Sequence, residues 1–242
     1  MRTLLGVLIF LLVISTFTLF AYLYGDITSR AVFNIEIANV SRVIDGDTFE
    51  TVKGDKVRLL GINTPEKSEK GYEDAKSFLQ QLEGEQIILE YIKEDRDKYG
   101  RKLRYVFLGN ILINEEILQR GFAHSYFYDE DKYTGEMKKA EEKARKQGIG
   151  IWKKSDDKCA GCLQVGLQYK EPESLTLNNK CGFECNLQGW QIKDEATHIY
   201  RLDIILKEGE NYTRNFSHIW NDEGDSLFLR DSSGLLVYYF SY

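Results

Sequence analysis

The run from residue 43 to residue 66 reads VIDGDTFETVKGDKVRLLGINTPE, and it decides the fold. Short β-prone runs cover residues 36–44, 47–53 and 56–62, with Gly-Asp turns between them. Two further runs, residues 87–92 and 103–108, have the same character. The pattern predicts a small β-barrel that is followed by helices.

Three helices are expected from the spacing of apolar residues. Residues 64–82 carry apolar side chains at helical intervals, and residues 114–120 and 134–147 are predicted as two further helices. Gly121 and Gly148 follow these last two segments, and glycine is suited to the left-handed exit of a helix.

The same run, together with DKYGR at residues 97–101, contains the groups that phosphodiester cleavage requires. Negative charge builds on the phosphate oxygens during attack by water, so preorganised positive charge is needed beside them. Arginine suits this task because its planar fork stays protonated and grips two oxygens. Oxygen ligands hold a divalent cation that polarises the phosphate, and a separate carboxylate orients or deprotonates the water.

Each of these roles has a candidate residue. The proposed metal ligands are Asp47, Asn63 and the backbone carbonyl of Thr64; the proposed catalytic residues are Glu66 as base and Arg58 and Arg101 as phosphate clamps. Taken singly, the motifs have ordinary structural readings, since DGD is a common turn, Thr-Pro-Glu starts helices and Lys-Tyr-Gly-Arg makes hairpin turns. Their joint occurrence in this order favours the functional reading.

The joint pattern resembles the staphylococcal nuclease (thermonuclease) family over about residues 36–153. The resemblance extends through Asn114-Glu115-Glu116, Gly121-Phe122-Ala123 and Gly150-Ile151-Trp152. It implies a five-stranded OB-type barrel with three helices. It also implies calcium-dependent hydrolysis of DNA and RNA that leaves 3′-phosphates, with Ca²⁺ as the cofactor and the roles on the six residues named above.

One position departs from the family pattern. The family usually has Asp as its second calcium ligand, and this chain has Asn63. An amide oxygen coordinates calcium but brings no charge. We therefore expect weaker calcium binding, with Asp45 or a substrate phosphate supplying charge, and tighter binding in Asn63→Asp.

Aromatic residues near the motifs are candidates for contact with nucleic acid. Aromatic side chains stack on bases in OB-type binders. The substrate-binding candidates are Lys98, Tyr99, Tyr126 and Tyr128. Phe127 is expected in the core, and the scattered His124, His198 and His218 are read as structural or surface residues.

The first 30 residues predict a membrane anchor. Leu4 to Tyr24 is almost wholly apolar or small-polar, and about 20 such residues span a bilayer as a helix. A cleaved signal peptide usually has a shorter apolar region and a small-residue cleavage site. An uncleaved signal anchor is favoured, with secretion as the alternative if the leader is cleaved. Arg2 marks the cytoplasmic end, which places the rest outside the membrane.

The acidic charge lies mostly in the last part of the chain. The 242 residues carry a net charge of −6 and are 43% hydrophobic, enough for two domains after the anchor. Residues 31–154 hold 22 basic and 23 acidic side chains, whereas residues 155–242 hold 8 and 14. A nuclease that acts through local arginines needs no basic surface, although its long-range attraction to DNA is then weak.

Residues 155–242 predict a second domain, after the nuclease-like domain at 31–154. Short strand patterns at 163–169, 175–177, 190–192, 199–206, 226–229 and 235–240 alternate with turns, which favours a β-sandwich. The stretches NLQGWQIKD at 186–194 and WNDEGD at 220–225 resemble the lamin-tail domain, an immunoglobulin-like fold. The expected role is binding of substrate, a partner protein or an envelope component, with a purely structural role as the alternative.

All four cysteines lie in this second domain. Cys159, Cys162, Cys181 and Cys185 have a spacing that zinc sites also use. An even count on the extracytoplasmic side favours two disulfides instead.

The sequence thus predicts a membrane-anchored, outward-facing calcium nuclease with DNA or RNA as substrate. The alternative is a catalytically weakened OB-type module that binds nucleic acid and is tethered to the envelope. A third class is an envelope or adhesion protein in which the sandwich matters most.

Overall fold

The computed structural model describes residues 14–16, 18, 34–92 and 95–242. The chain divides into two compact units, Met1–Ile35 and Glu36–Tyr242. In the first unit, residues 14–16 and 18 are helical. Most of the predicted anchor, Leu4–Tyr24, lies outside the described residues, and none of the helices within the described part has both the length and the apolarity to cross a membrane.

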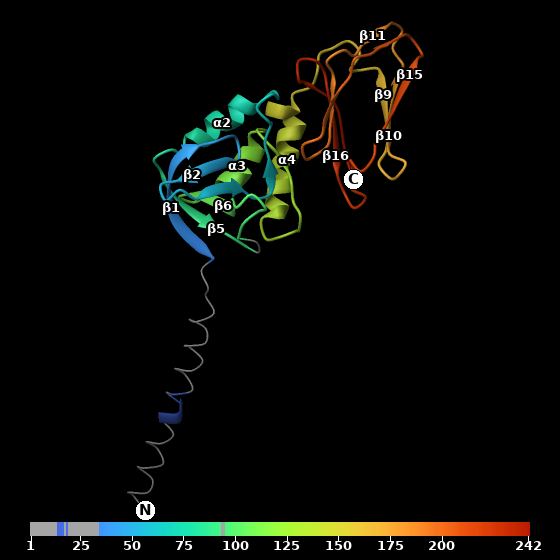
Figure 1. Ribbon diagram of the computed structural model, residues 1–242. Coiled ribbons are helices and arrows are strands. Elements are labelled where there is room, and N and C mark those ends of the chain that lie inside the picture. The colour runs from blue at the N-terminus through green and yellow to red at the C-terminus, as the bar shows by residue number, and fades with distance from the viewer. Residues whose placement is uncertain (1–13, 17, 19–33, 93–94) are drawn as a thin grey trace, which may run out of the picture. The chain divides into compact units, whose positions relative to one another are not determined.

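The second unit begins with a closed five-stranded barrel (Figure 1). Its strands are β1 (Ile35–Val43), β2 (Thr48–Thr51), β3 (Lys56–Leu59), β5 (Gln86–Glu90) and β6 (Lys102–Leu108). They follow the order β3-β2-β1-β5-β6, and the parallel pairing of β3 with β6 closes the barrel. The short β7 (Ile111–Leu112) pairs with the end of β6, at Phe107 and Leu108. The predicted OB-type barrel is confirmed.

Alternating burial explains why these strands close on themselves. In β3 the side chains of Val57 and Leu59 are buried, whereas Arg58 between them faces the other side. Phe49 and Tyr105 bring large buried rings into the same core. Because successive side chains of a strand point to opposite faces, this core also fixes where Arg58 projects.

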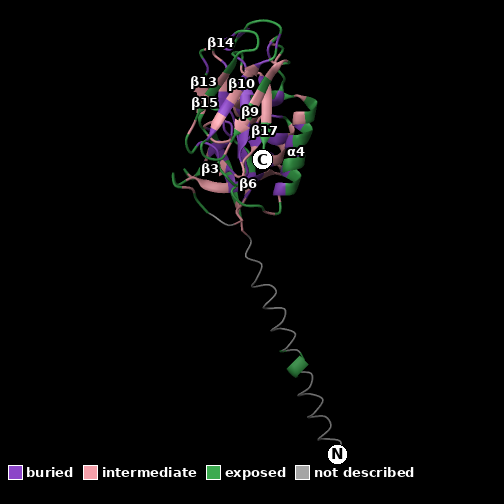
Figure 2. Cartoon of the chain, turned by 90° about the vertical axis from the view of Figure 1, so that its right-hand side faces the viewer, coloured by how far each residue is buried: buried purple, intermediate pink, exposed green. Residues whose placement is uncertain are grey.

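Three helices and short pieces complete the barrel part, which we define as residues 36–154. They are β4 (Ile62–Asn63), α2 (Tyr72–Gln80), α3 (Ile113–Gln119), β8 (His124–Ser125), α4 (Thr134–Gln147) and the 3₁₀ helix η1 (Gly150–Trp152). Gly148 ends α4 in the left-handed conformation, as predicted. Buried residues such as Met137, Ala140 and Ala144 line one side of α4, and its outer side is exposed (Figure 2).

The start of the first helix was predicted wrongly. The helical spacing placed it at Thr64, but α2 begins at Tyr72 after Gly71, whose φ is +95°. The intervening residues form a loop because the Thr64 amide and hydroxyl both donate to the Asp47 carboxylate. The backbone amide of Glu66 likewise donates to the carboxylate of Glu69.

The C-terminal part, residues 155–242, consists of strands that share one apolar core. The strands are β9 (Leu163–Gln168), β10 (Ser174–Asn179), β11 (Cys185–Asn186), β12 (Gln191–Lys193), β13 (Ile199–Arg201), β14 (Ile205–Leu206), β15 (Asn211–Asn215), β16 (Ser226–Arg230) and β17 (Leu236–Ser241). A three-stranded sheet, β15-β10-β9, and a four-stranded sheet, β13-β12-β16-β17, both contribute buried side chains to this core. Two sheets around one core agree with the predicted sandwich, whereas the lamin-tail resemblance stays a prediction.

Some strand predictions in this part were inaccurate. The predicted strand at 199–206 is divided into β13 and β14, because Leu202 turns into the core between them. The strand β15 was missed because its residues are mostly polar, with Tyr212 as its contribution to the core.

The cysteines form two disulfides, Cys159–Cys185 and Cys162–Cys181. The sulfur atoms of Cys159, Cys181 and Cys185 lie within 4.8 Å of one another, which is close enough for a shared metal. All four sulfurs are oxidised, however, so the thiolates that zinc needs are not present. The disulfides therefore prevail over the zinc alternative.

A small apolar cluster joins the two parts of the unit. It contains Ala144, Ile151 and Trp152 from the barrel part, and Phe228 and Leu236 from the C-terminal part. The Trp152 and Phe228 ring centroids lie 5.8 Å apart. The C-terminal sheets thus pack on the end of α4 and on η1.

Candidate active site

The turn between β1 and β2 places two carboxylates beside the loop that follows β4. The Asp47 amide donates to the Asp45 carboxylate at 3.2 Å, which tightens the turn. A Cβ atom at Gly46 would lie 2.7 Å from the Cβ of Ala75 and 2.8 Å from Oγ1 of Thr64. Because only glycine permits this approach, the DGD turn brings Asp47 against the Thr64 loop.

Asp47 and Arg58 form a pair at the centre of the site. Nη1 of Arg58 lies 2.5 Å from Oδ2 of Asp47. The same oxygen accepts from the Thr64 hydroxyl at 3.2 Å, and Oδ1 accepts from the Thr48 hydroxyl at 2.8 Å. Burial opposes the charge on Asp47, but Arg58 outweighs it and holds the pKa of this carboxyl below its usual range. Burial likewise opposes the charge of Arg58, but Asp47 raises its pKa, so both groups stay ionised.

The electrostatic environment of Asp45 differs from that of Asp47. Its burial, and then the neighbouring charge of Asp47, raise its pKa to about 6. Two carboxylates this close repel each other when both are ionised. A cation between them and the phosphate would relieve that repulsion.

Asn63 faces the same arginine. Its Oδ1 accepts from Nη2 of Arg58 at 3.3 Å, and its side chain is buried. Its Nδ2 donates in the opposite direction, to the backbone carbonyls of Glu195 at 3.0 Å and Ala196 at 3.2 Å. The amide oxygen therefore points to the site and the amide nitrogen to the C-terminal part.

The donor set of this site fits a hard cation. Asp47, Asn63 and the carbonyl of Thr64 offer oxygen atoms alone, which calcium prefers. In the structure Asp47 is shared with Arg58, so a bound cation and the arginine would divide this carboxylate between them. The residues present suit calcium better than zinc, which selects nitrogen and sulfur ligands.

Arg101 reaches the site from the DKYGR turn. The Asp97 carboxylate accepts from the backbone amides of Tyr99 and Arg101, both at 2.9 Å, and from Nε of Arg101 at 2.7 Å. Nη1 of Arg101 then lies 3.5 Å from the hydroxyl of Thr48, which itself donates to Asp47. The structural reading of this motif as a turn is correct, and the turn is what aims Arg101 at the site.

Glu66 lies at the exposed end of the loop that follows β4 and carries Thr64. Its side chain faces solvent two residues after Thr64. Its amide donates to the Glu69 carboxylate at 2.8 Å, which ties down the backbone that carries it. A carboxylate in this position is accessible to water and is separate from the metal ligands.

The substrate-binding candidates lie in two exposed groups. Tyr99 is 72% exposed, and Nζ of Lys98 lies 5.2 Å from the centre of its ring. Tyr128 is 85% exposed, and its ring lies 5.1 Å from that of Tyr126 in an edge-on arrangement. Burial, and then the hydroxyl of Tyr128, raise the pKa of Tyr126. Phe127 packs against the barrel core, as predicted.

Three features of the site were not predicted from the sequence. They are the carbonyls of the segment 195–196, the carboxylate of Glu69 and the imidazole of His124, which is buried and whose Nε2 donates to the Glu195 carbonyl at 2.7 Å. Backbone carbonyls leave no signal in a sequence. Glu69 lies in a charged, helix-like stretch where an acid is unremarkable.

Comparison with known proteins shows which proteins this chain is similar to. Residues 56–154 match the family model described as staphylococcal nuclease homologue. The thermonuclease of Staphylococcus intermedius is 36% identical over 126 residues, which cover 48% of this chain and 75% of that protein. The thermonuclease of Staphylococcus hyicus is 35% identical over 130 residues, 49% of this chain and 77% of the relative. Endonuclease YncB of Bacillus subtilis is 33% identical over 135 residues, 50% of this chain and 64% of the relative.

Proposed function

Because the chain belongs to the staphylococcal nuclease family, and is thus a hydrolase of phosphodiester bonds in nucleic acids, we propose that it requires calcium and leaves 3′-phosphate products. The observation that carries this proposal is the Asp47–Arg58 pair, with Asn63 and Thr64 at its border. In this pair, oxygen atoms that can bind a cation lie next to a guanidinium that can bind phosphate.

In the proposed reaction each residue has one task. Arg58 grips the phosphate oxygens, and Asp47, Asn63 and the Thr64 carbonyl would hold calcium, which polarises the phosphate when bound. Glu66 takes a proton from a water molecule whose oxygen forms the new bond to phosphorus. The bond from phosphorus to the 5′-oxygen breaks. Arg101 stabilises the charge that develops on the phosphate and on the leaving oxygen, which solvent protonates.

The two aromatic groups supply a surface for the substrate in this proposal. Exposed tyrosines stack on bases without regard to sequence, each at about 1–3 kcal/mol. Tyr99 with Lys98, and Tyr126 with Tyr128, are the contacts proposed. This arrangement is compatible with both DNA and RNA.

Cleavage assays on the full-length chain, purified in detergent, test the proposal. DNA and RNA are incubated with it in calcium and in a calcium chelator, next to Glu66→Gln. We expect cleavage in calcium alone, and a kcat about 10²- to 10⁴-fold lower in Glu66→Gln. The control is Glu85→Gln, which changes an exposed carboxylate that is not among the proposed site residues, and it should cleave normally. Cleavage that survives chelation would contradict the mechanism, and binding without cleavage would favour the alternative binding module.

We also propose that Leu4–Tyr24 anchors the protein, with residues 31–242 outside the membrane. The apolar run is long enough to span, and Arg2 precedes it. Two disulfides in the C-terminal part agree with an oxidising compartment. The protein should stay with membranes during alkaline carbonate extraction and be degraded by protease added to intact cells. Release into the medium would instead indicate a cleaved leader.

The role of the C-terminal part as a binding module for an envelope component or partner protein remains a prediction. The lamin-tail resemblance, over about residues 162–242, supports it. The contacts of this part with the site suggest a further role, which follows.

A further inference from the structure

The turn between β12 and β13, residues 194–198, lies on the candidate cation site. Both hydrogens of the Asn63 amide are directed at this turn, because its Nδ2 donates to the carbonyls of Glu195 and Ala196. These acceptors are more than 130 residues away in the sequence. Since carbonyls only accept, they force the nitrogen of Asn63 toward the turn and its oxygen toward Arg58.

A second contact fixes the same turn. Nε2 of His124 lies 2.7 Å from the Glu195 carbonyl, and His124 pairs with Asn63 between β8 and β4. Burial, and then the charge of Lys193, lower the pKa of His124 to about 3. The ring is therefore neutral at physiological pH, and Nε2 must carry its hydrogen to donate to this carbonyl. One carbonyl thus accepts from two neighbouring residues of the barrel part.

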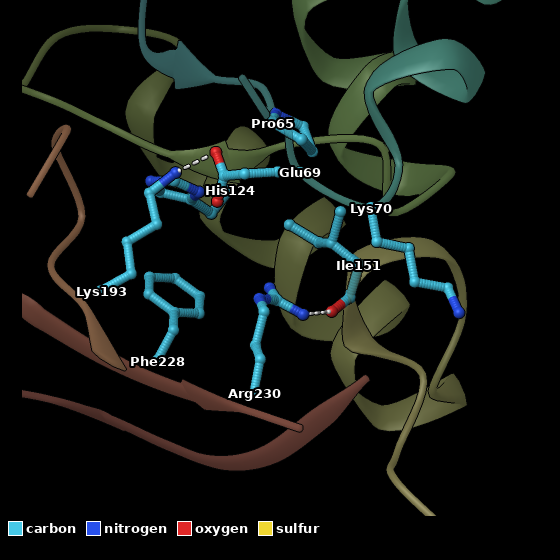
Figure 3. Close-up of a pocket in the computed structure, with 8 residues that line it drawn as sticks. All are labelled: Pro65, Glu69, Lys70, His124, Ile151, Lys193, Phe228 and Arg230. Carbon is cyan, nitrogen blue, oxygen red and sulfur yellow. Dashed lines mark hydrogen bonds and ion pairs between the residues drawn. The ribbon is translucent and has the colours of Figure 1, made fainter. Parts of the chain in front are cut away.

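A third contact runs to the loop of the proposed base. Nζ of Lys193, at the end of β12, lies 2.7 Å from Oε2 of Glu69, and the two side chains are only 6% and 8% exposed. The same oxygen accepts from the Glu66 amide. Figure 3 shows the Lys193–Glu69 pair, and beside it Arg230 donating to the Ile151 carbonyl at 2.7 Å. The C-terminal part therefore contacts the loop directly at Asn63, and at Glu66 indirectly through Glu69.

We propose that the β12–β13 turn and Lys193 are positioning elements of the cation site, so that the C-terminal part sets the cation affinity of the barrel part. This inference rests on the proposed function as a calcium nuclease. As a ligand, Asn63 presents its side-chain oxygen to the site only because its side-chain nitrogen donates to the two carbonyls of the turn. The loop that carries Thr64 and Glu66 is held at its far end through Glu69.

The inference changes what Asn63→Asp should do. A carboxylate has no hydrogen to donate, so it would lose both bonds to the turn and repel the two carbonyls. The added charge should therefore fail to tighten calcium binding in the otherwise native chain. The sequence-based expectation of tighter binding should hold only where the turn has been removed.

A double-mutant cycle on the full-length chain tests this coupling. In the short-turn variant, residues 194–198 are replaced by Asn-Gly, a two-residue hairpin turn that joins Lys193 to Ile199, which already pair across the strands. Calcium affinity is measured by calorimetry without substrate for the native chain, Asn63→Asp, the short-turn variant and the combination. The control is Glu208→Asn, which introduces the same residue type into a remote turn whose contacts stay within the C-terminal part.

We expect the short-turn variant to bind calcium at least threefold more weakly than the native chain. We further expect the effect of Asn63→Asp to differ at least threefold between the two backgrounds, with tightening only in the short-turn background. A smaller difference would overturn the inference, because Asn63 would then act independently of the turn. Near-ultraviolet circular dichroism establishes that each variant is folded.

A second variant covers the case in which the short turn prevents folding. Glu69→Met with Lys193→Met replaces the buried ion pair by apolar side chains and frees the Glu66 amide. At least threefold weaker calcium binding is expected, and a smaller change would overturn the inference. If the native chain neither binds calcium nor cleaves, the proposed function itself fails, and the positioning role falls with it. If binding and cleavage are intact but uncoupled from the turn, only the positioning role fails.

Discussion

The two arginines of the site lie in different environments, so replacing each of them should change stability and activity by different amounts. The Arg58 and Asp47 side chains are 15% and 9% exposed, whereas those of Arg101 and its partner Asp97 are 25% and 16% exposed. Arg58→Ala leaves a buried carboxylate without its partner, so it should lower the free energy of unfolding by about 2–4 kcal/mol and also abolish activity. Arg101→Ala should cost about 1 kcal/mol or less, while kcat falls about 10²- to 10³-fold.

Urea unfolding and steady-state kinetics of both variants check this contrast, with Arg96→Ala as the control at an exposed ion pair. Equal loss of stability in the two variants would show that the environment of Arg58 is not what the contacts indicate.

At this scale the sequence predicted which residues lie together, because they fall within short motifs. Asp47, Arg58 and Thr64 fall in one run of 24 residues, and the structure brings them into contact. The partners of Asn63 could not be predicted, because they are backbone carbonyls that any residue would offer. Position in the fold, rather than residue type, makes Glu195 and Ala196 part of the site.

At the scale of elements, the start of η1, which follows α4, depends on a close approach between two backbone segments. A Cβ atom at Gly150 would lie 2.0 Å from the Gly121 carbonyl oxygen, and Gly150 has a φ of +58°. Gly150→Ala should therefore destabilise the protein by about 2–4 kcal/mol, since it adds a backbone clash to an unfavourable φ. Gly109→Ala is the matched control, with the same φ of +58° and open space around its Cβ, and should cost about 1 kcal/mol. Thermal unfolding measures the loss of stability in both variants. An equal loss in the two would show that the clash at Gly150 does not contribute.

Periodicity predicted the existence of elements better than their ends. The strands of the barrel follow from β-prone runs between turns, and the helix α4 follows from helical spacing. The segment 64–71 has helical spacing too, but its amides bond to Asp47 and Glu69, so the loop persists until Tyr72. Tertiary hydrogen bonds decided this boundary, and a sequence pattern does not report them.

At the scale of the whole second unit, the contact between its parts should weaken as pH rises. Burial, and then the charge of Asp225, raise the pKa of Glu195 to about 7 from an ordinary value of 4.5. The charges of Asp194 and Glu141 raise this pKa further, whereas a hydrogen bond from Ser226 lowers it. Below about pH 4.5 the group is protonated in both the folded and the unfolded chain. Between 4.5 and 7 the folded chain holds the proton more tightly, so its stabilising effect is lost as pH rises through this window.

Glu195→Gln removes this titration while keeping the backbone carbonyl that contacts Asn63 and His124. The melting temperature of the variant relative to the native chain should therefore be about 2–4 °C higher at pH 8 than at pH 4.5, which corresponds to about 1 kcal/mol once solvent screening of this half-buried group is allowed for. Differential scanning calorimetry at the two pH values measures the difference. Glu184→Gln, at an exposed glutamate of the same part, controls for the loss of one charge. A difference that is equal at both pH values, or that has the opposite sign, would show that Glu195 is solvated and that the junction between the two parts does not sense pH through it.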